Sequence, residues 1–217
     1  MSKDIIIFGA GGFGREVASM IKRINANTPT WTLLGFVDDD SVHHPIGSRN
    51  EYGEILGDSN YLNSLKVPTC VTIAISNPHS VKKIVEKLSN PLLEFPNLIA
   101  ADAAILDKDN FNMGYGNILC SFVSMSCHVK LGNFNVFNNR CSVGHDAVIG
   151  DFNAFMTATR ISGGTTIGTL NSFGANSVLL QGLTVGENTT IGAGSVVMRK
   201  TKNGFTYIGN PAKQLFF

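Results

Sequence analysis

One pair of neighbouring side chains in this 217-residue chain has the types needed for proton transfer: His145 is followed directly by Asp146. A neutral imidazole near pH 7 can accept a proton from an amine or a hydroxyl group. A carboxylate beside the ring can orient it, as in the hydrolase triads. The pair therefore predicts a general base, and the alternative is a surface histidine without a chemical role.

A second group of residues could hold phosphate. Gly9, Gly11 and Gly14 form the pattern G-x-G-x-x-G directly after the apolar run 5–8 and before a helical pattern. In that context the glycines bring backbone N–H groups and a helix N-terminus to a pyrophosphate. Asp38 ends the next predicted strand, where its carboxylate could hold a ribose or a base edge. The alternative is a glycine turn that only lets the strand and the helix pack closely.

The elements that carry this glycine motif alternate between strand and helix over residues 1–95, which predicts a small Rossmann-like parallel sheet. About 95 residues is short for a complete dinucleotide domain, so a mononucleotide or a nucleotide sugar fits better. The predicted strands are 5–8, 32–37 and 71–75, and the predicted helices are 16–24, 58–65 and one that opens at Pro78 with Ser76 or Asn77 as its N-cap.

The histidine pair lies in a repeat of a different kind. Every sixth residue from Met113 to Val197 is large and apolar, and glycine often follows it. A period of six fits neither a helix nor an alternating strand, but it fits short extended segments joined by corners. Three sides of six residues predict five triangular coils over 113–202, with the glycines relieving the corners. Before Met113 the repeat weakens, and residues 107–110 predict a turn.

Composition excludes several classes of protein. The formal net charge is +1, so no overall field indicates a nucleic-acid partner. No apolar run reaches the roughly 18 residues of a membrane span, and the first residues lack the features of a signal peptide, which predicts a cytoplasmic protein. The four cysteines form no C-x-x-C pair, so they are expected to be reduced thiols.

The two halves together resemble a family of bacterial sugar acetyltransferases, whose members include sialic-acid O-acetyltransferases and UDP-4-amino-sugar N-acetyltransferases. The matching segments are 7–14, 35–39, 144–150 and 209–213. The resemblance implies a nucleotide-sugar-binding α/β domain (1–95) followed by a left-handed parallel β-helix domain (96–217). It also implies an acetyl-CoA-dependent enzyme without a metal, and a homotrimer that binds the cofactor between two subunits.

The resemblance further implies roles for single residues. His145 matches the general base, and Asp146 matches the acidic residue that orients it, which is often glutamate in the family. The positions matching acetyl-CoA contacts are Ala154, Ala175 and Ala193, although the family can have a second histidine at position 154. The positions matching the sugar-nucleotide site are Gly11, Gly12, Phe13, Asp38, Asp39 and Ser76.

Several roles stay open at this point. Arg199, Lys200, Lys202 and Lys213 are either contacts for the phosphates of CoA or a solvated charged edge. His128, nearly one coil before His145, is expected to stack close to it as a substrate-side or structural residue. His43, His44 and His79 lie in the other domain and receive no role.

The alternatives in function are of three kinds. Within the enzyme class, the acceptor is either an amine of a nucleotide sugar or a hydroxyl of a sialic acid or another glycan precursor. A zinc lyase of the γ-carbonic-anhydrase kind would need three converging histidines, and the repeat contains only His128 and His145. A nucleotide-sugar-binding scaffold would need no base, and an NAD-dependent oxidoreductase would need a second substrate domain.

Overall fold

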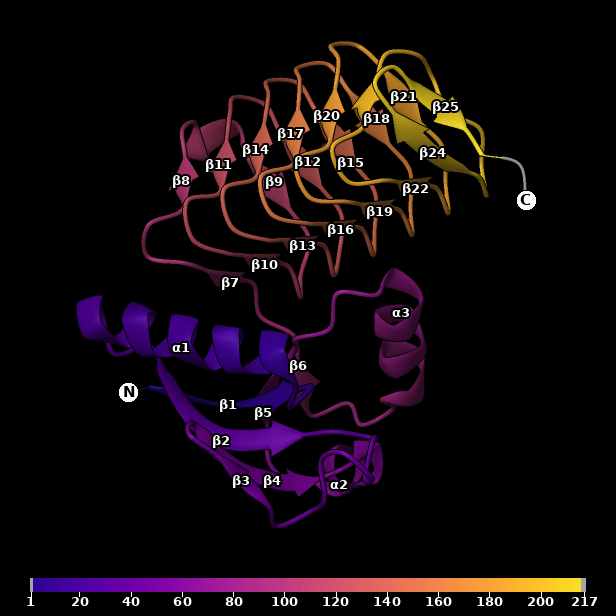
Figure 1. Cartoon of the computed structure of the whole chain (residues 1–217). Helices are drawn as coiled ribbons and strands as arrows, with labels where there is room; N and C mark the ends of the chain where they lie inside the picture. The colour runs from indigo at the N-terminus through magenta and orange to yellow at the C-terminus, as the bar shows by residue number, and fades with distance from the viewer. Residues whose placement is uncertain (1, 216–217) are drawn as a thin grey trace. The chain divides into compact units, whose positions relative to one another are not determined.

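The computed structural model describes residues 2–215, and contacts between residues divide the chain into two compact units, Met1–Ala101 and Asp102–Phe217 (Figure 1). The first unit alternates strands with helices, and the second is built from short strands that recur along the chain. Within residues 2–215, no helix has both the length and the apolar character needed to cross a membrane.

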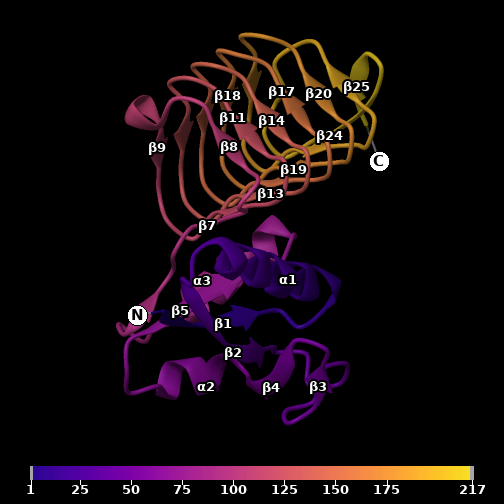
Figure 2. The ribbon, with the colours of Figure 1, turned by 90° about the vertical axis from the view of Figure 1, so that its left-hand side faces the viewer.

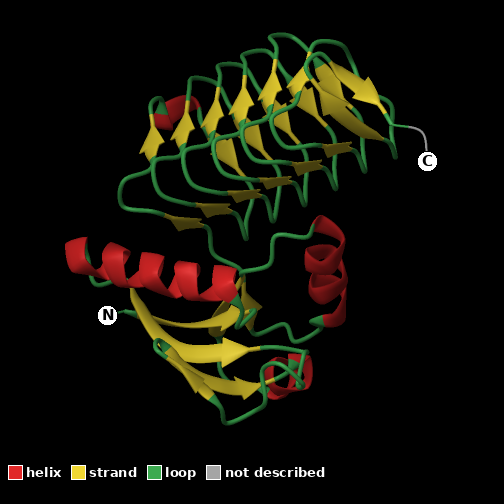
Figure 3. Cartoon of the chain, in the orientation of Figure 1, coloured by secondary structure: helices red, strands yellow, loops and turns green. Residues whose placement is uncertain are grey.

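The first unit is a six-stranded sheet in the order β3-β4-β2-β1-β5-β6, parallel except for the β3–β4 pair (Figure 3). The predicted Rossmann-like parallel sheet is confirmed. Strand β1 lies between β2 and β5, so the connections that follow neighbouring strands run to opposite sides of the sheet at the carboxyl end of β1. A crevice for ligands opens at such a point. The elements are β1 (Lys3–Phe8), α1 (Gly12–Asn27), β2 (Trp31–Val37), β3 (Arg49–Asn50), β4 (Gly53–Gly57), α2 (Ser59–Ser64), β5 (Thr69–Ile73), α3 (Pro78–Lys87) and β6 (Leu93–Glu94).

Helix α1 packs on this sheet through residues spaced three and four apart, with Val17 and Ile21 almost fully buried. Two glycines of the motif allow this packing. Gly9 has a φ of +106°, and a Cβ on Gly14 would collide with the carbonyl oxygen of Gly9. These two glycines therefore serve the close approach of strand and helix, which is the structural alternative considered for the motif.

The sequence did not reveal strands β3, β4 and β6. Strands β3 and β6 have two residues each, which is too short for an alternating pattern. Strand β4 is bounded by Gly53 and Gly57 and buries Ile55 between them. Its place beside β2 depends on pairing between segments that are distant in sequence, and no local pattern records such pairing.

The second unit is a left-handed parallel β-helix with three faces, and Figure 2 shows its coils lying side by side. We name each face after one of its strands. The β14 face contains β8 (Ala104–Ile105), β11 (Ser124–Met125), β14 (Ser142–Val143), β17 (Arg160–Ile161), β20 (Val178–Leu179) and β23 (Val196–Val197). The β15 face contains β9 (Asn112–Met113), β12 (Lys130–Leu131), β15 (Val148–Ile149), β18 (Thr166–Ile167) and β21 (Thr184–Val185). The β16 face contains β10 (Ile118–Leu119), β13 (Val136–Phe137), β16 (Ala154–Phe155), β19 (Ser172–Phe173), β22 (Thr190–Ile191), β24 (Thr206–Gly209) and β25 (Ala212–Gln214). Its first strand along the chain, β7 (Leu98–Ile99), precedes the division at Ala101.

The six-residue register is confirmed strand by strand. Every strand from β9 to β23 ends on one of the predicted interior residues. Paired residues on a face lie one coil apart, as in Leu119 with Phe137 and Phe137 with Phe155. Equivalent side chains therefore stack along the axis of the prism. Phe137, Phe155 and Phe173 form one buried aromatic column with ring centroids 4.4 and 4.6 Å apart. A second column is a ladder of buried amides, in which the Nδ2 of each asparagine donates to the Oδ1 of the one before it: Asn117, Asn135, Asn153 and Asn171.

The corners differ from the prediction. After every interior residue except Val197, the third residue has a positive φ, and most of these residues are not glycine, as at Arg140 and Asp146. The prediction that the following glycine relieves the corner is therefore wrong. Those glycines have no positive φ, but a Cβ on Gly132 would lie 2.9 Å from the backbone of Gly150. They are needed for the close approach of the next coil.

The β-helix also begins earlier than the expected Met113. Met125 pairs with Ile105, twenty residues before it, whereas Leu131 pairs with Met113 at the regular spacing of eighteen. The two additional residues are accommodated where the 3₁₀ turn Lys108–Asn110 lies, at the predicted turn. The repeat is thus interrupted there, and the coil continues on its other side.

Candidate active site

The predicted catalytic pair is formed at one corner of the β-helix. The Nδ1 atom of His145 lies 2.7 Å from the Oδ2 atom of Asp146, and both side chains are more than half exposed. An ionised carboxylate only accepts hydrogen bonds, so the proton in this contact belongs to Nδ1. The other ring nitrogen, Nε2, then carries the lone pair. The geometry is that of a base held in one tautomer by its neighbour.

The corner explains how adjacent residues can meet. Neighbouring side chains on an extended strand point to opposite sides. Asp146 has a φ of +57°, and this left-handed conformation turns the chain after β14 so that both side chains lie outside the prism. Aspartate tolerates this conformation better than most residues. The shorter side chain therefore still reaches the imidazole, although the family often has glutamate at this position.

The neighbouring coils contribute backbone and a thiol to this corner. The residue one coil before His145 is Cys127, whose carbonyl accepts a hydrogen bond of 2.9 Å from the N–H of Asp146. One coil after it is Gly163, and the N–H of Gly164 donates to the carbonyl of His145 over 2.7 Å. His128 lies in register with Asp146 instead, at an equivalent position of positive φ. The expectation that His128 stacks beside His145 is thus shifted by one residue.

The positions expected to contact acetyl-CoA lie elsewhere on the β-helix. Ala154 is buried in β16, whereas Ala175 and Ala193 follow β19 and β22 at the corner that ends the β16 face. The N–H of Gly194 donates to the carbonyl of Ala175 over 2.8 Å, so these two alanines are in register one coil apart. His145 lies at the corner that ends the β14 face. Within one chain, Ala175 and Ala193 therefore belong to a different edge of the prism from His145.

Two of the four basic residues share the edge of His145. Arg199 and Lys200 follow β23 at the same corner position, three coils beyond the histidine, and both are exposed. Three coils correspond to about 14 Å along the axis at the usual spacing between strands. Lys202 and Lys213 lie farther along the chain, and Lys213 belongs to the terminal hairpin of β24 and β25.

The first unit has a cavity of about 370 Å³ beside the glycine motif. Gly11 caps the N-terminus of α1 without a side-chain hydrogen bond, and a Cβ on it would approach the Nε2 of His44. Arginine side chains come from α1 and β3. The lining residues are Ala10, Gly11, Arg15, His43, His44, Pro45, Ser48, Arg49, Asn50 and Ile55. A helix N-terminus and a basic lining both favour an anion.

The predicted residues of this site lie at different distances from the cavity. Gly11 lines it, and Asp38 borders it through His44, since their Oδ2 and Nε2 atoms are 4.0 Å apart. The same Oδ2 accepts a hydrogen bond of 2.8 Å from the N–H of Ala10, so Asp38 also holds the glycine loop. Gly12 is exposed with open space where a Cβ would be, and Phe13 is half-buried in the first turn of α1.

Asp39 and Ser76 do not line the cavity. Asp39 accepts hydrogen bonds from the N–H and hydroxyl of Ser59 and from Lys87. Partial burial raises the pKa of Asp39, but the bonds from Lys87 and Ser59 outweigh this and lower it. Ser76 is exposed directly before Asn77, whose side chain caps α3 through the N–H of Ser80. The bonds from Ser59, the first residue of α2, indicate that Asp39 holds the start of this helix.

Sequence reasoning missed the segment after β2, in which the loop supplies His43 and His44 and strand β3 supplies Arg49. His43 bonds to Asp40 over 2.8 Å, and this hydrogen bond lowers the pKa of Asp40. Asn50 contributes a buried Nδ2 atom that has no hydrogen-bond partner. The one usable signal was topological, because loops after the carboxyl ends of parallel strands surround the ligand crevice.

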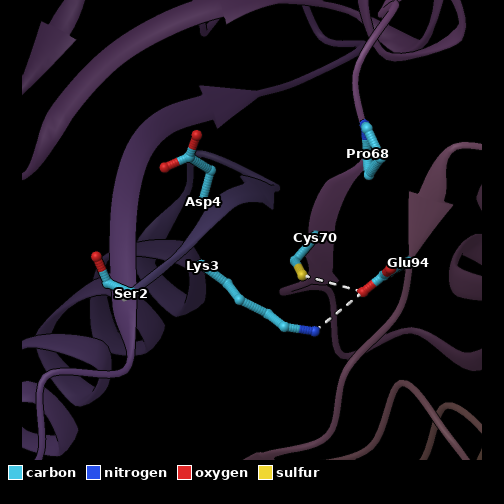
Figure 4. A pocket seen from close by; sticks show the side chains of 6 residues that line it. All are labelled: Ser2, Lys3, Asp4, Pro68, Cys70 and Glu94. Atoms are coloured by element: carbon cyan, nitrogen blue, oxygen red, sulfur yellow. Dashed lines mark hydrogen bonds and ion pairs between the residues drawn. The ribbon is translucent and has the colours of Figure 1, made fainter.

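A second cavity of about 240 Å³ lies at the opposite ends of these strands, where β1 and β5 begin (Figure 4). Lys3 and Glu94 form an exposed ion pair of 3.4 Å, and the thiol of Cys70 lies 3.7 Å from the same carboxylate. Burial, followed by the charge of Glu94, raises the pKa of that thiol. No predicted site residue lines this cavity.

Similarity to known proteins covers both units. Residues 4–88 match the family model described as the PglD N-terminal domain. The acetyltransferase domain of PglB from Neisseria gonorrhoeae FA1090, solved in complex with acetyl coenzyme A, is 28% identical with a TM-score of 0.88, over 99% of this chain and 100% of that one. WeeI from Acinetobacter baumannii AYE is 28% identical with a TM-score of 0.87, over the same shares of both chains.

Over both units, the chain is thus similar to bacterial sugar acetyltransferases. A variant of GDP-perosamine N-acetyl transferase from Caulobacter crescentus, solved with CoA and GDP-perosamine, shares the fold with a TM-score of 0.82 at 23% identity, over 99% of this chain and 97% of that chain. No curated protein sequence matches this chain significantly. Within residues 2–215, no group of three or more His, Cys, Asp or Glu side chains is placed to hold a metal ion.

Proposed function

We propose that this sugar acetyltransferase transfers an acetyl group from acetyl-CoA to an amino group of a nucleotide-linked sugar, for surface glycan biosynthesis. The observation that carries the proposal is the 2.7 Å contact between His145 and Asp146, which leaves Nε2 free to accept a proton. PglB, at 28% identity over nearly the whole chain, was solved with acetyl coenzyme A. The GDP-perosamine enzyme, more distant, acts on an amino sugar by its name.

The chemistry assigned to the corner is a single acyl transfer. The substrate amine attacks the carbonyl carbon of the thioester while Nε2 of His145 takes a proton from the nitrogen. A new C–N bond forms, the C–S bond breaks, and the proton passes to the departing thiolate of CoA. Asp146 keeps the imidazole in the tautomer that can accept the proton. Backbone N–H groups stabilise the oxyanion that forms in between.

The first test is a panel of acceptors. Purified protein is incubated with acetyl-CoA and with UDP-, dTDP- or GDP-linked amino sugars, each paired with the matching hydroxyl sugar, and with a free sialic acid. CoA release and the gain of one acetyl group by the sugar are measured. An amino sugar acetylated much faster than its hydroxyl counterpart supports the proposal, and a preference for a hydroxyl supports O-acetylation of a sialic acid or another precursor.

A non-enzymatic scaffold is the remaining alternative. It predicts binding of a nucleotide sugar without binding of CoA, which isothermal titration with each ligand resolves. His145→Ala then tests the mechanism on the true acceptor, and wild-type turnover in this variant would eliminate His145 as the base. Loss of turnover with unchanged binding of both ligands supports the assigned role.

We further infer that residues 1–95 bind the sugar nucleotide and that its phosphates occupy the cavity beside Gly11. The N-terminus of α1 favours an anion there, and the arginines at positions 15 and 49 can donate to it although they also form exposed ion pairs with Glu51 and Glu54. Arg49→Ala should raise the KM for the sugar nucleotide at least about tenfold, as a lost charged hydrogen bond would. The KM for acetyl-CoA should stay unchanged. Lys82→Ala is the matched control, because Lys82 pairs with Glu86 as Arg49 pairs with Glu54, and all four side chains are exposed.

The β-helix domain, residues 96–217, is proposed to form homotrimers with acetyl-CoA between two subunits. The support is the separation of His145 and the alanine corner onto different edges of one prism. Mixing His145→Ala with Ala175→Trp tests this directly. A site shared between subunits returns about a quarter of the wild-type activity in randomly mixed trimers, because that share of interfaces is intact. A site within one subunit returns none, and a monomer in light scattering would contradict the trimer.

The protein is also proposed to act in the cytoplasm, where acetyl-CoA is supplied. Fractionation of cells that produce the protein tests this proposal.

Arg199 and Lys200 are proposed to contact phosphates of CoA, since they share the edge of His145. Dephospho-CoA should bind more weakly than CoA to the wild type and equally to a variant with both residues changed to Gln. If the ratio of the two Kd values is unchanged in the variant, these residues belong to a solvated edge.

A further inference from the structure

Gly163 has a distinctive place in the repeat. It is the second residue after an interior residue, a position that occurs fifteen times from Tyr115 to Arg199. Gly163 is the one glycine among them. The other positions are occupied by Tyr115, Ser121, Cys127, Asn133, Asn139, His145, Asp151, Thr157, Thr169, Ala175, Gln181, Glu187, Ala193 and Arg199. The corner therefore accepts side chains of every size at this point.

Backbone conformation does not require glycine here. The glycines with positive φ in the β-helix include Gly164 and Gly182, but Gly163 is not one of them. The reason must lie in its surroundings. A Cβ on Gly163 would lie 2.6 Å from Nε2, 2.7 Å from Cε1 and 2.9 Å from Cδ2 of His145. These distances are shorter than any ordinary van der Waals contact, so the imidazole occupies the space that a side chain would fill.

The two coils cannot separate to relieve such a collision. The N–H of Gly164 donates to the carbonyl of His145 over 2.7 Å, which fixes the backbone of one coil on the other. A methyl group at position 163 would therefore displace the ring instead of the chain. The ring is free to move outward because its side chain is more than half exposed. Moving outward breaks the 2.7 Å contact with Asp146 and turns Nε2 away.

We infer that Gly163 is a positioning residue for His145: its missing side chain provides the flat surface against which the imidazole is held. This inference rests on the proposed function, because it assigns Gly163 to the same base. The position one coil beyond the histidine is thus part of the machinery although it contributes no side chain.

The test compares Gly163→Ala and Gly163→Thr with the wild type and with His145→Ala, using the complete protein. Threonine is compatible with this corner, since it occurs at positions 157 and 169. We expect kcat to fall roughly 10- to 100-fold in the alanine variant, the scale of a displacement of about 1 Å, and further in the threonine variant. The KM for acetyl-CoA should change less than about twofold, and the thermal midpoint should hold or rise, because alanine reduces the entropy of the unfolded chain.

A double variant and a spectroscopic measurement separate positioning from other effects. In the His145→Ala background, Gly163→Ala should cause no further loss, whereas a methyl that obstructs the substrate would cause the same loss there. The Nδ1–H resonance of His145 should weaken or shift in Gly163→Ala, which is measurable whether or not His145 proves to be the base. Wild-type kcat together with an unchanged resonance would overturn the inference. Full turnover by His145→Ala with an altered resonance would overturn the proposed function alone.

Discussion

Replacing Asp146 with asparagine tests the geometry of the corner with little disturbance of the fold. Asparagine adopts the φ of +57° at this position more readily than most residues, and Asn176 and Asn188 have this conformation at equivalent corners. The variant removes the carboxylate charge, and its amide can donate to Nδ1 as well as accept from it. When it donates, Nε2 carries the proton and cannot act as a base. The expected effect is therefore on kcat.

The size of the effect depends on how much water reaches the pair. In the single chain the side chains of His145 and Asp146 are 56% and 62% exposed. An exposed pair contributes about 0.2–1 kcal/mol, which corresponds to a loss of roughly 1.4- to 5-fold. If substrates and a partner subunit cover the corner, a charge-assisted hydrogen bond contributes about 1.5–3 kcal/mol, or roughly 10- to 150-fold. We expect the larger range, because acyl transfer takes place between bound substrates.

The assay is steady-state CoA release with saturating acetyl-CoA and acceptor. Asp109→Asn is the matched control, since it removes another exposed carboxylate at the beginning of the β-helix and should leave kcat unchanged. A loss within fivefold would show that the corner remains exposed during the reaction. Unchanged kcat in Asp146→Asn would refute the assignment of Asp146 as the residue that orients the base.

Three further outcomes follow from the surroundings of single residues. N-ethylmaleimide should modify the exposed Cys127 first and inhibit the enzyme, because Cys127 lies one coil before His145; Cys127→Ser should stay active in the presence of the reagent. Burial raises the pKa of Cys141 to about 11, so peptide mapping should find this thiol modified last. The folded state lowers the pKa of Asp39, so its stabilisation is complete above the usual value of 3.8 and is lost as the pH falls through the lowered value; the difference in Tm from Asp39→Asn should shrink only in that acid range, and a constant difference would contradict this. Phe155→Ala removes the middle ring of the aromatic column and should cost about 3–5 kcal/mol, a fall of roughly 6–20 °C in the Tm of the β-helix, so a fall under about 3 °C would contradict the packing.

The β-helix could be predicted in detail because its register is recorded locally. Each interior residue is followed by the same short turn, so one period repeated from Met113 onward defines strands, corners and faces. The coil before Met113 could not be read in the same way, since two inserted residues moved Ile105 out of the period. In the first unit, strand β4 was missed because its pairing with β2 joins segments that are distant in sequence.

The residues of the candidate site likewise fall into those that the sequence indicated and those that only the tertiary structure revealed. The sequence alone indicated His145 and Asp146, because the two residues are neighbours at one corner and their contact needs no distant partner. It also indicated that Gly11 opens a helix where phosphate could lie. Only the tertiary structure showed that Arg49 lines the same cavity as Gly11, since Arg49 lies in the two-residue strand β3, which is too short for a sequence pattern.

Only the tertiary structure showed whether a glycine serves ligand binding or the close packing of neighbouring segments. Gly9 and Gly14 belong to a phosphate-binding pattern, yet their role in the fold is to let β1 and α1 approach each other. Gly163 belongs to no pattern, and its meaning appears only when the next coil brings it against His145. A sequence determines period, charge and neighbouring pairs, because these are properties of adjacent residues. Contacts one coil apart depend on how the chain closes on itself, and this chain closes eighteen residues later, where the imidazole meets a residue without a side chain.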